Sequence, residues 1–161
     1  MRKLSHIGPG GKMRMVDVSG KPATARTAIA EGRISMTAEA FALIRGGATP
    51  KGDVLAAARV AGILAAKRTS ELIPLCHPLP LSFVGIEFSF DDSAGAIIVR
   101  AEARTNERTG VEMEALTAVS LALLTIYDMA KSADRAMEIG GVRLVEKTGG
   151  SRGDYRASDK A

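Results

Sequence analysis

The clearest pattern in the sequence is an alternation of apolar and polar residues over two segments near its middle. In residues 82–90 the even positions are apolar, and in residues 96–104 the odd positions are apolar. This two-residue period is typical of strands that bury one face. The linking residues 91–95, Asp-Asp-Ser-Ala-Gly, favour a turn. The sequence therefore predicts a β-hairpin, whose buried face comprises Val84, Ile86, Phe88 and Phe90 on one strand and Ile97, Val99, Ala101 and Ala103 on the other.

Three segments carry helical signals. Residues 37–44 form a short helix that ends at a Gly-Gly pair, and residues 53–68 form an Ala-rich helix with an aspartate at its N-cap. Residues 109–133 form a third helix, which Thr109 and Glu112 open as a capping box. Because this last helix is apolar on nearly every side, we expect it to be the buried centre of the domain.

The order of the predicted elements indicates the fold. Residues 24–36 alternate loosely and form a first strand, and residues 137–147 form the last one. The order is then βαββαβ with one extra helix. We predict an α+β protein with a ferredoxin-like antiparallel sheet and helices packed on one face. Residues 1–22 are predicted to be an irregular N-terminal arm, 23–150 a single catalytic domain and 151–161 a mobile tail.

Composition narrows the setting. The 161 residues are 46% hydrophobic and 25% charged, which is enough for a core and excludes disorder of the whole chain. The single cysteine excludes an internal disulfide and favours a reducing compartment. The first residues lack a secretory apolar region, and no uninterrupted run of 18 apolar residues occurs. We therefore expect a cytoplasmic protein that does not enter a membrane.

The net charge of +4 and pI of about 9.5 favour an anionic partner. The chain lacks the long Lys/Arg runs and exposed aromatic pairs of nucleic-acid modules, so we expect no nucleic-acid binding. A small phosphate ester fits better. A basic surface without any function is an equally weighted alternative at this point.

Asp128 and Lys131 stand out on the third helix. Asp128 follows Leu121 and Leu124 on an apolar stripe, and Lys131 is its neighbour three residues on. One interpretation is a buried acid–base couple with shifted pKa values. The alternative is an ordinary surface ion pair at a helix end.

Glu112 and Glu114 lie in the first turn of the same helix. Helix N-termini favour carboxylates, which suffices for Glu112, but Glu114 shares the spacing of Leu121 and Asp128. Glu114 and Asp128 are 14 residues apart, or about 21 Å along a helix. If both serve one site, different subunits supply them.

Cys76, His77 and Lys51 complete the candidates. Residues 73–80 contain three prolines and are predicted to be extended, so Cys76 and His77 point to opposite faces and do not form a catalytic dyad. His77 is instead a hydrogen-bond donor to an anion, or merely part of a structural loop. Lys51 lies in a turn just before a helix N-terminus, where an anion is welcome. Two histidines and one cysteine offer no metal-ligand spacing, so we expect no metal site.

Four long stretches of the chain are distinctive: HIGPGGKMRMVDVSGK, KGDVLAAARVAGILAAKRTSELIPLCHPLPL, TGVEMEALTAVSLALLTIYDMAK and VRLVEKTGGSRGDY. Together they resemble one family, the molybdenum cofactor biosynthesis protein C family of cyclic pyranopterin monophosphate synthases. The resemblance implies a lyase that rearranges 3′,8-cyclo-7,8-dihydro-GTP to cyclic pyranopterin monophosphate and releases pyrophosphate. It also implies a ferredoxin-like fold and a homohexamer, a trimer of dimers, with active sites at subunit interfaces. No cofactor is expected, although Mg²⁺ can accompany the triphosphate.

The resemblance also implies roles for individual residues. It implies that Asp128, Lys131 and Lys51 are catalytic, and it does not say which of them is the acid and which the base. Those implied to bind substrate are Leu75, Cys76, His77, Met113, Glu114, Glu112, Arg26 and Lys147. One departure is Ser151-Arg152, where the family often has Lys-Ser, which puts a phosphate role of the tail in doubt. The alternative function is a non-catalytic anion- or nucleotide-binding protein on the same fold.

Overall fold

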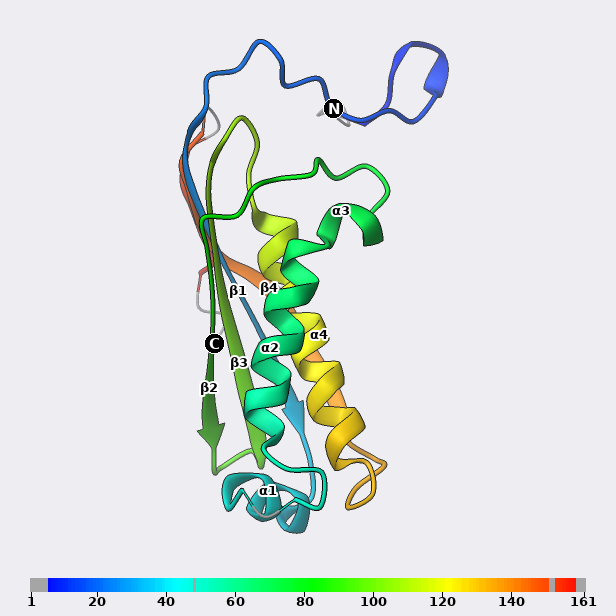
Figure 1. Ribbon diagram of the computed structural model, residues 1–161, viewed down its shortest axis with the longest axis vertical. Helices are drawn as coiled ribbons and strands as arrows, with labels where there is room; N and C mark the ends of the chain where they lie inside the picture. Colours follow the sequence, from blue (N-terminus) through cyan, green and yellow to red (C-terminus); the bar gives the residue numbers. More distant parts are fainter. Residues whose placement is uncertain (1–5, 48, 151–152, 159–161) are drawn as a thin grey trace.

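The structure, a computed structural model, describes residues 6–47, 49–150 and 153–158. The sheet strands are β1 (Thr24–Ser35), β2 (Phe83–Asp91), β3 (Ala96–Glu107), β4 (Glu138–Thr148) and β5 (Tyr155–Arg156). The helices are α1 (Ala38–Arg45), α2 (Val54–Lys67), α3 (Thr69–Leu72) and α4 (Glu112–Ala130), with a 3₁₀ turn, η1, at Pro9–Gly11. Figure 1 shows an elongated molecule in which α2 and α4 run along the sheet and α1 closes one end.

The sheet has the order β2-β3-β1-β4-β5, with every neighbouring pair antiparallel. Its four long strands and the helices between them confirm the ferredoxin-like α+β fold. The predicted hairpin is also confirmed, since Ile86 pairs with Ala101 and Phe88 with Val99. Ala101 in turn lies opposite Ala30 on β1, so the apolar positions of three strands form one buried face.

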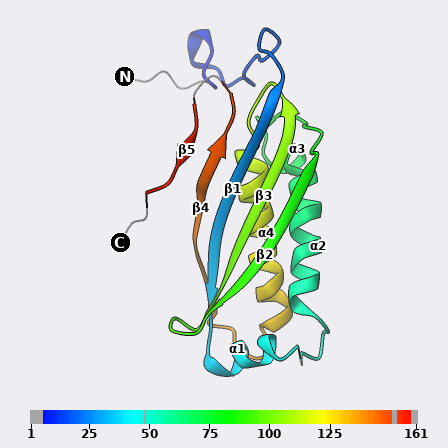
Figure 2. The same ribbon diagram turned by 90° about the vertical axis from the view of Figure 1, so that its left-hand side faces the viewer.

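Both long helices cover that buried face, while the other face of the sheet is left open (Figure 2). α4 lies over β1 and β3, with Val119, Leu123 and Ile126 fully buried. Its length and hydropathy match those of a membrane span, but half of it is buried in the fold. Its apolar character is thus explained by packing on the sheet and on α2, as expected for the centre of the core.

Several local predictions need correction. The capping box does not form: the N-cap of α4 is Val111, without a side-chain cap, and the Glu112 carboxylate binds Lys147 instead. Residues 73–80 are not extended throughout, because the Cys76 amide donates to the Ile73 carbonyl and closes a turn. In the tail, Tyr155–Arg156 pair with β4, a contact that the sequence pattern did not predict. Ser151-Arg152 lie outside the described residues.

The close approach of α2 and α4 depends on Gly62. A Cβ there would lie 2.7 Å from the Ala118 carbonyl oxygen and would overlap Ile86 on the sheet. We expect Gly62→Ala to lower the free energy of unfolding by about 1–3 kcal/mol, because backbone must move to make room. Denaturant unfolding measures this. Gly140→Ala on β4, where the added Cβ has nothing within 4 Å, is the matched control and should be nearly neutral.

Candidate functional site

A cavity of about 270 Å³ lies at the end of the sheet where β1 begins and β4 ends. Its walls come from the N-terminal arm, the segment between α3 and β2, the β3–α4 connection, the first turn of α4 and the end of β4. It is lined by all eight residues predicted to bind substrate: Arg26, Leu75, Cys76, His77, Glu112, Met113, Glu114 and Lys147. Segments far apart in the sequence thus meet in one pocket, while the individual roles stay predictions.

The arm is fastened over this cavity by two hydrogen bonds. His77 Nε2 lies 2.8 Å from the Val16 carbonyl oxygen, which can only accept, so this nitrogen carries the proton. Arg108 Nη1 donates to the Ser19 carbonyl at 3.0 Å. Val16, Val18 and Lys21 of the arm line the pocket as a result.

Two cations of the pocket, Arg26 and Lys147, are held in place by contacts within the chain. Arg26 donates through Nε to the Glu107 carbonyl at 2.7 Å and through Nη2 to the Arg108 carbonyl at 3.2 Å. Lys147 Nζ lies 2.9 Å from Glu112 Oε1, and both side chains are mostly buried. Such pre-placed donors suit an anion, since little reorganisation is needed on binding.

Gly149 and Gly150 complete the wall beside Arg26. Both have positive φ, 85° and 87°, which a residue with a side chain rarely adopts. A Cβ on Gly150 would overlap the Arg26 guanidinium, so the glycine pair lets that cation reach the pocket. The Gly149 amide donates a hydrogen bond to Asp154 Oδ1 at 3.1 Å.

Glu114 is the most perturbed acid of the pocket. It is only 4% exposed, and burial raises its pKa to about 7, helped by the nearby Glu112 charge and opposed by its own backbone amide. At neutral pH this carboxyl is therefore present in both its protonated and its ionised form, as a group that exchanges protons requires.

Cys76 does not have the properties of a nucleophile. Burial raises the pKa of its thiol, and the Glu114 charge adds to that effect. A neutral thiol is a weak nucleophile, which agrees with the rejection of a Cys–His dyad.

The three residues predicted to be catalytic form a second cluster elsewhere. Lys131 Nζ lies 2.7 Å from Asp128 Oδ1, and Lys51 Nζ donates to the Asp128 backbone carbonyl at 2.9 Å and lies 3.6 Å from Oδ2. The hydrogen bond and charge of Lys131 lower the pKa of Asp128, which in turn raises that of Lys131.

Within one chain this cluster is a surface feature, not a buried couple. The Asp128 side chain is 61% exposed, and its stripe with Leu124 faces away from the sheet. The inward orientation that the sequence predicted is therefore wrong for the single chain. The alternative interpretation, a surface ion pair at a helix end, describes it better.

The two clusters lie at opposite ends of α4, the helix that runs along the sheet in Figure 1. Glu114 is in its first turn and Asp128 in its last, about 21 Å apart along the axis. One small molecule cannot contact both groups of the same chain.

Six polar residues that line the pocket were not among the predicted site residues, namely His6, Lys21, Thr27, Arg108, Thr109 and Thr148. Arg108 had a usable signal, since a cation just before a helix N-terminus is the same pattern that singled out Lys51. Lys21 had only the general basic character of the first 33 residues.

No cluster of three or more His, Cys, Asp or Glu side chains that could hold a metal ion occurs in residues 6–47, 49–150 and 153–158. The expectation that no metal or cofactor is required stays a prediction.

Fold and pocket together define a ferredoxin-like α+β protein with a cation-lined pocket at one end of its sheet, suited to a small anionic molecule. The pattern that defines the MoaC family matches residues 15–150. Proteins of Brucella ovis and Brucella melitensis, both named cyclic pyranopterin monophosphate synthase, are 57% identical over 159 residues, which cover 99% of this chain and 96% of theirs. The chain belongs to the MoaC family.

A solved structure of AtUAH in complex with (S)-hydroxyglycine aligns with 86% of this chain and 30% of that one, at a TM-score of 0.42 and 14% identity. This likeness is too weak to support any argument.

The raised pKa of Glu114 predicts a pH-dependent stability. Between its unfolded pKa near 4.5 and about 7, the folded chain binds one proton more than the unfolded chain, so stability falls as pH rises through this window. Glu114→Gln removes that penalty. We expect the unfolding free energy of Glu114→Gln minus that of the wild type to increase by roughly 1–3 kcal/mol between pH 5 and pH 8. Denaturant titrations at both pH values measure this. The exposed Glu39→Gln should show no such trend, and an equal trend in both variants would contradict the assignment.

Proposed function

We propose that this chain is a cyclic pyranopterin monophosphate synthase, a phosphorus–oxygen lyase of molybdenum cofactor biosynthesis. It converts 3′,8-cyclo-7,8-dihydro-GTP to cyclic pyranopterin monophosphate and releases pyrophosphate. The purine-derived ring opens and recloses as a pterin, while the α-phosphate closes into a cyclic phosphate as its bond to the β-phosphate breaks. Family membership and the near-complete match to relatives of that name support this assignment.

The observation that carries the proposal is the composition of the pocket. Four cations face it, Lys21, Arg26, Arg108 and Lys147, as a triphosphate requires. Glu114 and the Cys76–His77 segment form another part of its lining, where polar and apolar groups are mixed as a ring system requires. Mg²⁺ bound by the triphosphate is compatible with this setting, and we propose no resident cofactor.

The remaining chemistry requires groups that give and accept protons. Glu114 supplies one such group inside the pocket. The cluster of Lys51, Asp128 and Lys131 supplies the others, since it holds an ionised carboxylate between two ammonium groups. Which of these acts as acid and which as base stays open.

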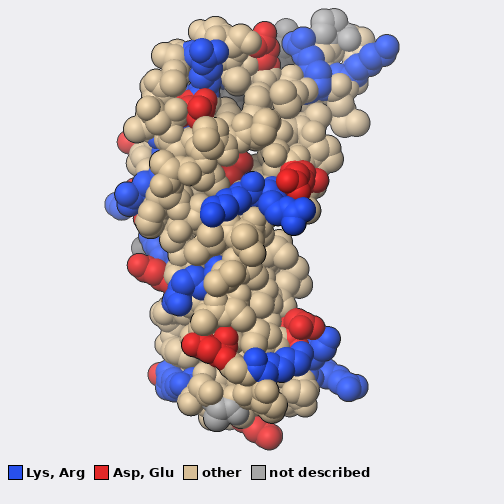
Figure 3. Space-filling view, in the orientation of Figure 1, with Lys and Arg blue, Asp and Glu red and all other residues tan. Residues whose placement is uncertain are grey.

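A complete site therefore needs two chains. Val60 and Leu64 on α2 and Leu124 on α4 are each more than half exposed. The helical side of the molecule has wide uncharged areas between its groups of charges (Figure 3). If two copies pair antiparallel across these helices, each Asp128 cluster meets the pocket of the other copy. We propose that such dimers assemble into a homohexamer in the cytoplasm, with active sites at the interfaces.

Turnover tests the reaction. Purified protein incubated with 3′,8-cyclo-7,8-dihydro-GTP should release pyrophosphate, as measured by a coupled phosphate assay. Asp128→Ala should lose activity by about 10²-fold or more, because it removes a proton-transferring group and leaves two unpaired ammonium groups. Circular dichroism checks that the variant folds. Release of no pyrophosphate by the wild type would leave the non-catalytic anion-binding alternative.

Subunit mixing tests the shared site. Glu114→Ala and Asp128→Ala are each expected to be inactive alone. When the two are co-expressed in equal amounts, half of the dimers are mixed and each has one intact site. Activity should then return to about a quarter of the wild-type value.

The matched control for mixing is co-expression of Glu114→Ala with Glu112→Ala. Both changes lie in the same half of the site, so no mixed dimer has an intact one. Equal recovery in this control, or no recovery in the first mixture, would rule out a site shared between subunits.

A further inference from the structure

Arg45, at the end of α1, is held more firmly than any role described so far requires. Its guanidinium forms a two-pronged ion pair with Asp92, with Nη1–Oδ1 at 2.5 Å and Nη2–Oδ2 at 3.0 Å. The same group lies over two aromatic rings, 4.8 Å from the centre of Phe41 and 4.7 Å from that of Phe90. This planar guanidinium, paired through two nitrogens and stacked on two rings, has a fixed orientation. A lysine ammonium group could not be oriented in this way.

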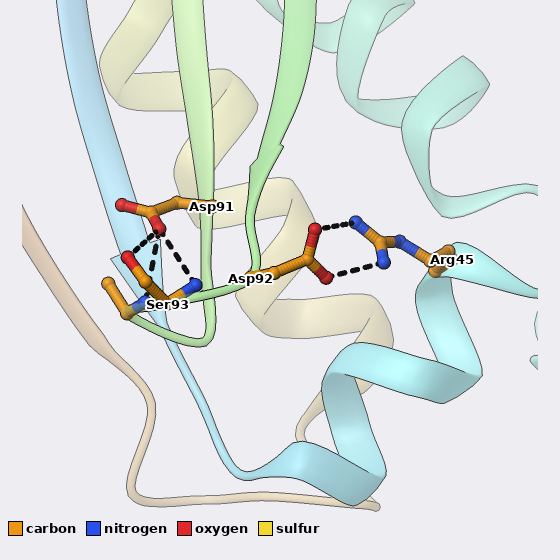
Figure 4. A network of polar contacts seen from close by, with 5 residues as sticks. Arg45, Asp91, Asp92 and Ser93 are labelled. Carbon is orange, nitrogen blue, oxygen red and sulfur yellow. Dashed lines mark hydrogen bonds and ion pairs between the residues drawn. The ribbon is translucent and has the colours of Figure 1, made fainter.

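The turn that carries Asp92 is held by hydrogen bonds of its own (Figure 4). In the β2–β3 turn, Asp91 Oδ1 accepts hydrogen bonds from the Ser93 hydroxyl at 2.6 Å, the Ser93 amide at 3.0 Å and the Ala94 amide at 3.1 Å. This network fixes the turn that presents Asp92. The C-terminal end of α1 is thereby tied to the tip of the hairpin.

The other end of α1 is tied to the segment that follows α4. Asp134 Oδ2 accepts the Thr37 amide at 2.8 Å, and its Oδ1 accepts the Ala136 amide at 2.8 Å. Asp134 comes three residues after Lys131. The position of α1 is therefore set relative to the end of α4 that carries the Asp128 cluster.

α1 leads directly to Lys51. The helix has eight residues, too few to be stable alone, and it ends at Gly46, before Gly47 at positive φ. Lys51 follows Arg45 by six positions and reaches back to Asp128. The direction in which α1 ends thus sets the point from which the chain continues to Lys51 and α2.

We infer that Arg45 is a positioning residue, which through its clamp between Asp92, Phe41 and Phe90 sets α1 so that Lys51 meets Asp128. The inference rests on the proposed function for its activity readout. Exposed ion pairs contribute little to global stability, so the effect of the clamp is on geometry rather than on folding. The competing account is that the N-cap of α2, Asp53, which follows Lys51 by two residues, positions Lys51 alone.

The test compares Arg45→Met with Arg104→Met. Arg104 is a matched control, because it also pairs with a carboxylate, Glu102, and lies over a ring, Phe83, but on the open face of the sheet. We expect kcat of Arg45→Met for pyrophosphate release to fall about tenfold or more, since misplacing a reacting group is costly. KM should change less than about twofold, because the pocket is untouched. Arg45→Lys should be intermediate, and Arg104→Met should match the wild type.

A second readout follows Lys51 itself. Acylation by an amine-reactive ester, quantified by mass spectrometry, should label Lys51 of Arg45→Met about threefold faster or more, because a lysine released from hydrogen bonding is more reactive. Lys67, at the far end of α2, should be labelled at an unchanged rate. If Arg45→Met does not fold, Asp92→Asn, which removes the charge and keeps the shape, replaces it in both measurements.

Two results would overturn the inference. One is a folded Arg45→Met with kcat within twofold of wild type, and the other is a loss of kcat without faster labelling of Lys51. If the wild type released no pyrophosphate, the proposed function would fail. The labelling ratio would still decide whether Arg45 positions Lys51.

Discussion

The tight packing of α4 against its neighbours is the constraint on which the rest of the structure depends. On the sheet side, a Cβ on Gly32 would lie 2.9 Å from both Leu123 and Val119. On the α2 side, Gly62 faces the backbone of α4. With glycines on two sides, the helix sits deep in the fold and acts as a rigid spacer of 19 residues, about 28 Å long. The length of the helix therefore fixes the distance between the pocket at one end and the Asp128 cluster at the other.

The same packing leaves one apolar side of α4 uncovered by the residues that the structure describes. Two sides of the helix are covered, by β1 and by α2, yet Leu124 stays more than half exposed. Such exposed apolar surface agrees with the proposed dimer, in which a second copy covers it and completes the site. Burying the Asp128 carboxylate at such an interface would be costly unless its two ammonium partners were buried with it. Lys51 and Lys131 already lie beside it in the Asp128 cluster.

The fold was predictable because its strands alternate cleanly and its order of elements is simple. Pairs such as Phe88–Val99 follow from alternation on both strands of the hairpin. The orientation of Asp128 was not predictable, because a helix that is apolar on three sides gives no periodic signal that separates the sheet side from an exposed one. The missing capping box has a non-local cause, since Lys147, 35 residues away, binds the carboxylate that a local cap would use. Strand β5 is two residues long, too short to carry a pattern.

The gathering of Arg26, Cys76, Glu114 and Lys147 was predictable only through resemblance, since no spacing along the sequence places these segments together. Under the proposed function, anion binding in the pocket that they form is expected to change the protonation of its carboxyls. Lys147 is paired with Glu112, whose charge already raises the pKa of Glu114. A phosphate beside Lys147 would share the positive charge that now offsets Glu112, and two carboxyls close together favour sharing a proton. Under the proposed function, binding of the triphosphate would by this route protonate Glu114 more fully.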